Sequence, residues 1–128
     1  MLDEFPELVR FARGDFDPGT FPHREHIRMG FEMLRRHTFA ETACHYSYAL
    51  RTMMAKAGRP EAFHQTITIA FLSLIAERMQ SGGVADFLAF AEANPDLMDK
   101  SALARWYRPE RLTMDAARRT FLLPDPVR

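Results

Sequence analysis

Three of the five histidines in the 128-residue sequence stand where imidazole chemistry is expected. His23 and His26 are three residues apart, a spacing that places two side chains side by side on one face of a helix. His64 opens a second apolar segment, which runs from Phe63 to Thr68. Neutral imidazoles bind Zn, Fe, Cu or Mn, and three of them leave positions for water or substrate. The sequence therefore predicts a divalent transition-metal site formed by His23, His26 and His64.

A substrate bound at this metal would need further polar groups close by. Tyr46 and Thr68 are the candidate catalytic residues, because a hydroxyl beside the ion orients a ligand or positions a substrate. The metal would act as a Lewis acid or activate water or oxygen. We expect a small metal-binding protein acting on a small-molecule substrate, and the sequence leaves open whether it is an enzyme.

The same three histidines also have a purely structural interpretation. His-x-x-His is a short pattern, and an imidazole in a helical core often donates to a carbonyl or caps a helix. The helix dipole disfavours a positive charge in the first turn, so these rings should be neutral. Neutral rings suit both interpretations. The alternative is a non-catalytic module without a cofactor, which binds a small ligand or a protein partner and uses the histidines as polar core groups.

Other reactive patterns in the sequence are weak. Cys44 is the only cysteine, which excludes an intrachain disulfide and predicts an inert, buried or half-buried thiol. Ser81-Gly82-Gly83 lacks the Lys and Ser or Thr of a phosphate-binding loop. Five arginines between positions 105 and 119 alternate with acidic residues, which indicates a solvated face. One of them is a candidate clamp for a carboxylate substrate.

Helices must position the histidines, because the apolar residues recur with a helical period. A helix is expected from Pro22 to about His37, with its arginines facing water and Gly30 leaving space on the histidine side. Thr38 and Glu41 match a capping box, which predicts a third helix ending near Gly58. The most apolar helix should run from Pro60 to about Met79 and hold His64 in its inner stripe.

Shorter helices complete the predicted fold. They are expected over residues 3–12, 84–93, 97–107 and 113–119, with Leu88 among the buried residues of the second. Residues 121–127 contain two prolines and should be extended. The sequence predicts an all-α protein, a compact single-domain helical bundle over residues 1–128 with about five to seven helices and an extended C-terminal tail.

The composition limits the partners. Lys plus Arg and Asp plus Glu both number 17, so the chain lacks the positive charge typical of nucleic-acid binders. No apolar run is long enough to cross a bilayer, so we expect no membrane partner. The acidic N-terminus does not have the pattern of a signal peptide, and a cytoplasmic location is expected. The chain has more apolar helices than a small bundle needs to cover its core, which is compatible with a homodimer.

Three short motifs resemble those of a group of small, functionally uncharacterised bacterial helical proteins. The motifs are an aromatic-x-His-x-x-His, a His-x-Thr-x-Thr and an Ala-Arg-x-x-Phe-x-x-Pro-Asp. In this chain they are Phe21 to His26, His64 to Thr68, and Ala117 to Asp125. The resemblance supports grouping the three histidines and implies no particular activity or substrate.

Overall fold

The computed structural model describes residues 5–126, and within them it is all-α, as predicted. The α-helices are α1 (Pro6–Ala12), α2 (His23–Arg36), α3 (Phe39–Lys56), α4 (Gln65–Gly82), α5 (Phe87–Ala93), α6 (Pro109–Leu112) and α7 (Asp115–Arg119). Short 3-10 helices connect them: η2 (Pro18–Thr20), η3 (Pro60–Ala62), η4 (Pro95–Met98) and η5 (Lys100–Arg105). A short extended segment follows α7.

Local sequence signals set several helix ends. The Thr38 hydroxyl accepts from the Glu41 amide at 3.1 Å, and the Glu41 carboxylate accepts from the Thr38 amide at 2.9 Å, so the predicted capping box is present. Gly83 ends α4 with a φ of 59°, a left-handed conformation that suits glycine. These signals explain why α3 begins at the predicted position and why α4 ends at Gly82.

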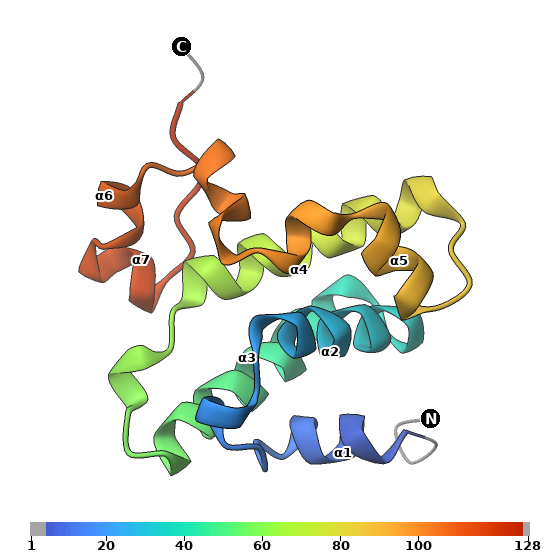
Figure 1. Cartoon of the computed structure of the whole chain (residues 1–128). Coiled ribbons are helices and arrows are strands. Elements are labelled where there is room, and N and C mark those ends of the chain that lie inside the picture. The colour runs from blue at the N-terminus through green and yellow to red at the C-terminus, as the bar shows by residue number, and fades with distance from the viewer. Residues whose placement is uncertain (1–4, 127–128) are drawn as a thin grey trace.

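The long helices stack in layers, with α2 and α3 between α1 on one side and α4 on the other (Figure 1). Gly30 on α2 lies against side chains of α4. A Cβ at that position would lie 3.0 Å from Ile75 Cδ1 and 3.3 Å from Leu72 Cδ1. The space that the sequence predicted beside Gly30 is therefore filled by α4.

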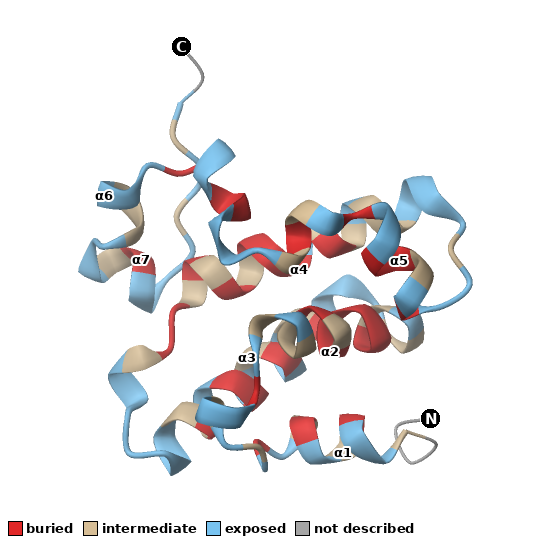
Figure 2. Ribbon diagram, viewed as in Figure 1, coloured by how far each residue is buried: buried red, intermediate tan, exposed pale blue. Residues whose placement is uncertain are grey.

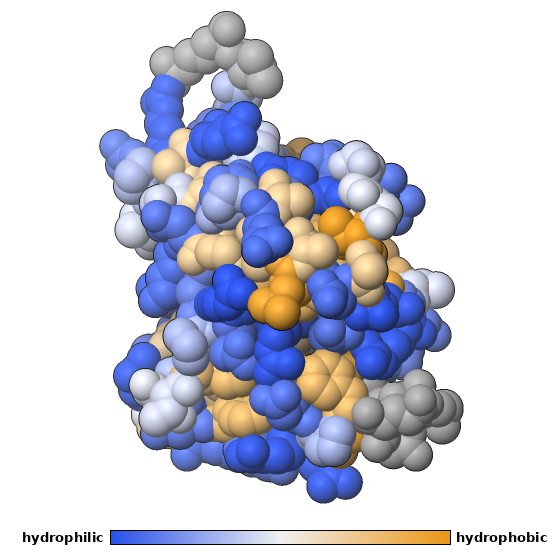
Figure 3. Space-filling model, turned by 45° about the vertical axis from the view of Figure 1, so that its right-hand side comes forward, coloured by the Kyte–Doolittle hydropathy of each residue, from blue (hydrophilic) through white to orange (hydrophobic). Residues whose placement is uncertain are grey.

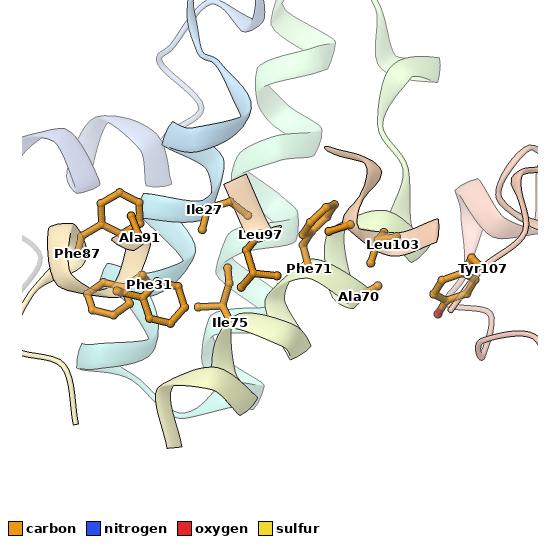
Figure 4. Packing of buried hydrophobic residues seen from close by; sticks show 12 residues of the cluster. Ile27, Phe31, Ala70, Phe71, Ile75, Phe87, Ala91, Leu97, Leu103 and Tyr107 are labelled. Atoms are coloured by element: carbon orange, nitrogen blue, oxygen red, sulfur yellow. The ribbon is translucent and has the colours of Figure 1, made fainter. Parts of the chain in front are cut away.

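The buried side chains form two clusters, and α2 contributes to both. Figure 2 shows buried positions along α2 and along the helices on either side of it. One cluster lies among α1, α2 and α3 and includes Phe11, Met29 and Tyr46. The other lies among α2, α4, α5 and the segment that follows α5, where buried side chains from Phe87 to Tyr107 form one continuous row (Figure 4). Because α2 contributes side chains to both clusters, it is packed against neighbouring elements on two of its sides.

The C-terminal segment is attached to the beginning of α4 by side-chain hydrogen bonds. The Thr66 hydroxyl donates to the Thr120 carbonyl at 2.8 Å and accepts from the Leu122 amide at 3.0 Å. The Tyr107 hydroxyl donates to the Leu122 carbonyl at 2.7 Å. These bonds hold the extended tail against the helix that follows His64.

Two predictions about burial were wrong. Leu88 is 66% exposed, because the short α5 buries the stripe formed by Phe87, Phe90 and Ala91, and Leu88 lies about 100° away from Phe87 on the helix. Cys44 is exposed, because α3 turns Thr42 and Tyr46 inward and leaves position 44 on its outer face.

Apolar atoms on the outer surface form several separate areas divided by hydrophilic side chains on the face seen in Figure 3. The exposed large hydrophobic residues come from different elements, including Tyr48 on α3, Leu88 on α5 and Leu123 in the tail. Within residues 5–126, no helix has the length and hydropathy needed to span a bilayer.

Candidate functional site

All three predicted site histidines line one cleft of about 780 Å³. The cleft lies where the beginnings of α2 and α4 meet the end of α3 and the η3 turn. Its walls are mainly apolar and include the aromatic side chains of Phe21, Phe63 and Phe71. His23, His26 and His64 therefore lie at one cleft, although they come from two separate parts of the chain.

His64 is fully occupied by hydrogen bonds to the backbone. Its Nε2 lies 2.7 Å from the Leu112 carbonyl, and its Nδ1 accepts from the Ile67 amide at 3.1 Å. Because a carbonyl only accepts, Nε2 must carry the proton and Nδ1 must be the acceptor. Burial lowers the pKa of His64, which favours this neutral ring.

The position of His64 in the helix differs from the prediction. A continuous helix from Pro60 was expected, but η3 ends at Ala62 and α4 begins only at Gln65. His64 lies between them with an extended backbone and caps α4 through its ring nitrogen. An imidazole in this role replaces the usual Ser, Thr, Asp or Asn side chain, so no ordinary capping residue marks this helix start in the sequence.

His23 keeps one ring nitrogen available. Its Nε2 donates to the Leu97 carbonyl at 2.9 Å, which leaves Nδ1 as an acceptor. The ring packs edge-on against Phe71, with 4.7 Å between centroids. Burial lowers the pKa of His23, and the nearby Lys100 ammonium lowers it further. The ring is therefore neutral at pH 7 and presents a lone pair.

His26 lies one turn along α2, with its ring 5.1 Å from that of Phe21 and 6.5 Å from that of His23. Burial, together with the neighbouring His23 ring, lowers the pKa of His26 to about 4. A ring with this pKa is neutral at pH 7 but is a weak proton acceptor, because general bases work best when their pKa is near the working pH. His26 is therefore better suited to hydrogen bonding or metal ligation than to proton abstraction.

The side chains as positioned do not form a three-histidine metal centre. Within residues 5–126, no three His, Cys, Asp or Glu side chains are grouped so that they could hold one ion. The 6.5 Å between the His23 and His26 rings exceeds what two imidazoles bound tetrahedrally at about 2.1 Å would show. Ligation by His64 would require one of its two hydrogen bonds to break. The metal site remains a prediction.

The two candidate catalytic hydroxyls are both engaged with backbone carbonyls. Tyr46 is buried beneath α2 and does not line the cleft; its hydroxyl donates to the His26 carbonyl at 2.8 Å. Burial raises the pKa of Tyr46. Thr68 does line the cleft, and its hydroxyl donates to the His64 carbonyl at 2.7 Å. Of the two, Thr68 is the one that a ligand in the cleft would reach.

Two cationic residues of the cleft were missed from the sequence. Arg59 and Lys100 both line it, whereas no Asp or Glu in the described part of the chain does. The arginines between positions 105 and 119, from which the sequence suggested a clamp for a carboxylate substrate, do not line the cleft. Among them, Arg111 donates to the Leu123 carbonyl and Arg118 donates to the Glu61 carbonyl. Arg59 precedes η3 and Lys100 begins η5, so neither belongs to a long periodic helix that would have indicated its direction.

Comparisons of the chain with protein-family models, with curated proteins and with solved structures found no match.

Proposed function

We propose that the cleft binds a small organic molecule with an apolar body. The observation that carries the proposal is the convergence of His23, His26 and His64 on one largely apolar cleft. Its volume of about 780 Å³ falls within the range of ligand pockets, roughly 300 to 1,000 Å³. Such pockets combine apolar walls with a few polar groups that fix the orientation of the ligand, and this cleft has both.

The two ends of the cleft would have different roles. The aromatic rings of Phe21 and Phe71 already pack against His26 and His23, so a flat apolar ligand would extend an existing set of ring contacts. The lone pair on His23 and the ring of His26 supply polar contacts. His64 and Thr68 are held by the backbone and would form a rigid wall.

The test uses the neutral fluorescent probe N-phenyl-1-naphthylamine and a variant that fills the cleft. Ala62 lines the cleft, so Ala62→Trp should weaken probe binding at least tenfold. Ala55→Trp, on the exposed side of α3, is the matched control and should bind the probe like the wild type. Equal binding by both variants, or absence of binding by the wild type, would contradict the proposal.

A metal site centred on His23 and His26 is the second candidate. The observation in its favour is the hydrogen bond from His23 Nε2 to the Leu97 carbonyl, since metal-bound histidines usually donate their other nitrogen in this way. It ranks second because the 6.5 Å between the two rings would have to shorten for both to bind one tetrahedral ion. In addition, no carboxylate of residues 5–126 lines the cleft to balance a divalent charge, and the Lys100 ammonium acts on both rings.

Zinc titration followed by calorimetry distinguishes the metal hypotheses. A His23–His26 site predicts one bound ion that is lost in His23→Gln and retained in His64→Gln. The three-histidine site predicts loss of the ion in both variants. No binding by the folded wild type would eliminate both.

A further inference from the structure

We propose that the ligand of the cleft is an organic anion, an apolar molecule carrying one carboxylate, sulfonate or phosphate group. The inference rests on the proposed small-molecule binding and adds the charge of the ligand. It is carried by the asymmetry of the lining, which contains the cationic side chains of Arg59 and Lys100 and, among residues 5–126, no acidic side chain.

The two cations are not neutralised within the described structure. Between residues 5 and 126, neither Arg59 nor Lys100 takes part in an ion pair, whereas Arg28, Arg36, Lys56 and Arg78 all do. An anion that enters the cleft would therefore gain partners without displacing a carboxylate. Arg59 offers a planar fork that matches a carboxylate or phosphate group, and Lys100 offers a compact charge.

Acidic residues next to the cleft are bound to other groups. Asp99 precedes Lys100 but accepts from the Ser101 amide and hydroxyl, both at 2.8 Å. Glu25 is paired with Arg28 at 2.7 Å. Asp17 accepts from the Gly19 amide at 3.1 Å. Of these three carboxylates, Glu25 is paired with a cation, whereas Asp99 and Asp17 accept from neutral donors and keep their charge. The Asp99 carboxylate raises the pKa of His23 and so opposes Lys100, but none of the three carboxylates lines the cleft itself.

The Lys100 ammonium also acts electrostatically on His23 and His26, which line the same cleft. It contributes to the lowered pKa of both His23 and His26, although burial is the larger cause for each. Proximity of one ammonium to both rings means that an anion beside Lys100 would also lie near them. Neutral imidazoles do not repel an anion, and a ring N–H can donate to it.

A matched pair of probes separates the charge from the apolar body. 8-Anilinonaphthalene-1-sulfonate carries the same ring system as N-phenyl-1-naphthylamine with one added sulfonate. We expect the anionic probe to bind about tenfold more tightly than the neutral one. The double variant Arg59→Gln/Lys100→Gln should lose this difference while it keeps its affinity for the neutral probe. The control Arg13→Gln/Arg108→Gln removes the same charge from exposed positions outside the cleft and should behave like the wild type.

The outcomes distinguish this inference from the binding proposal. If the wild type binds the neutral probe as tightly as the anionic one, the cleft binds small molecules but the inferred charge is wrong. If the control variant loses as much affinity for the anionic probe as the cleft variant, the charge effect is a general surface property and the inference is again overturned. If neither probe binds, the proposed function itself fails. Circular dichroism of each variant verifies that the fold is retained.

Discussion

The histidines at the two ends of the cleft form different hydrogen bonds. At the beginning of α4, both ring nitrogens of His64 are hydrogen bonded, one to the Ile67 amide and one to the Leu112 carbonyl. At the beginning of α2, His23 uses one nitrogen for the Leu97 carbonyl and keeps the other as an acceptor, and His26 faces it across 6.5 Å. Histidines that look equivalent in sequence therefore differ: both ring nitrogens of His64 have backbone partners, whereas His23 has a partner for only one.

This difference shows that burial alone does not identify a functional histidine. His64 is the most thoroughly bonded of the three, and its backbone partners account for its position without any ligand. His23 and His26 are only partly buried, and their hydrogen-bonding capacity is only partly used. Unused capacity in a cleft is the stronger indication of function, because buried polar groups are usually satisfied.

The largest expected effect is on stability at His64. His64→Ala removes a helix cap and leaves the Leu112 carbonyl and the Ile67 amide without their partner, so the free energy of unfolding should fall by about 2–4 kcal/mol. His26→Ala should lower it by less than about 1 kcal/mol at pH 7. Urea unfolding with an unchanged m-value measures both.

His64→Asn is the matched control, because asparagine retains capping but does not reach Leu112 as an imidazole does. It should recover part of the lost stability, about 1 kcal/mol. A His26→Ala variant that is destabilised as much as His64→Ala would show that the two ends of the cleft do not differ in the way described.

The next effect is on the pH dependence of stability. The pKa of His26 falls from 6.5 to about 4 in the folded protein, so the unfolded chain takes up a proton first as the pH decreases. This stabilising contribution is present above pH 6.5 and is lost between pH 6.5 and about 4. Between pH 7 and pH 5 it should amount to about 1–2 kcal/mol after allowance for solvent screening.

The measurement compares urea unfolding of the wild type and of His26→Gln at pH 7 and pH 5. The wild type should lose more stability on acidification than the variant does. Equal losses would mean that the His26 ring is solvated and titrates at its ordinary pKa, and His26 could then not be described as a buried neutral ring.

The smallest effect is on the position of a single proton. The hydrogen bonds of His64 require the Nε2–H tautomer, with Nδ1 unprotonated. Nitrogen chemical shifts from two-dimensional NMR of ¹⁵N-labelled protein should show this tautomer for His64 and should not change when a cleft probe is added. The His26 resonances should change. A probe-induced shift at His64 larger than that at His26 would reverse the assignment of roles.

The sequence predicted the helical fold because its signals were local. Thr38 and Glu41 gave the start of α3, and Gly30 indicated a close approach that α4 fulfils. It also predicted that His23 and His26 would be side by side, since this follows from helical spacing alone. The grouping of His64 with them came from periodicity and from the resemblance of the motifs.

The details of the site depend on contacts between distant residues, which have no periodic signal. Leu112, the partner of His64, is 48 residues away, and Leu97, the partner of His23, is 74 residues away. Lys100 reaches the cleft from a 3-10 helix whose direction is set by tertiary packing. For these reasons the occupied nitrogens of His64 and the positive charge of the lining could not be derived from the sequence.

The hydrogen bonds that tie the C-terminal segment to the start of α4 also imply an order of local unfolding. Thr66, His64 and Glu61 contact residues 48 to 57 positions later, and each of these bonds ends in or beside α6, α7 or the tail. Segments of this kind commonly open together, before the rest of the protein unfolds. Backbone amides from about residue 109 onward should therefore exchange with deuterium as one group, and opening of that group would release the His64 ring from its carbonyl partner. One wall of the cleft would then gain freedom on the timescale of this opening, while the His23–His26 wall stays folded within α2.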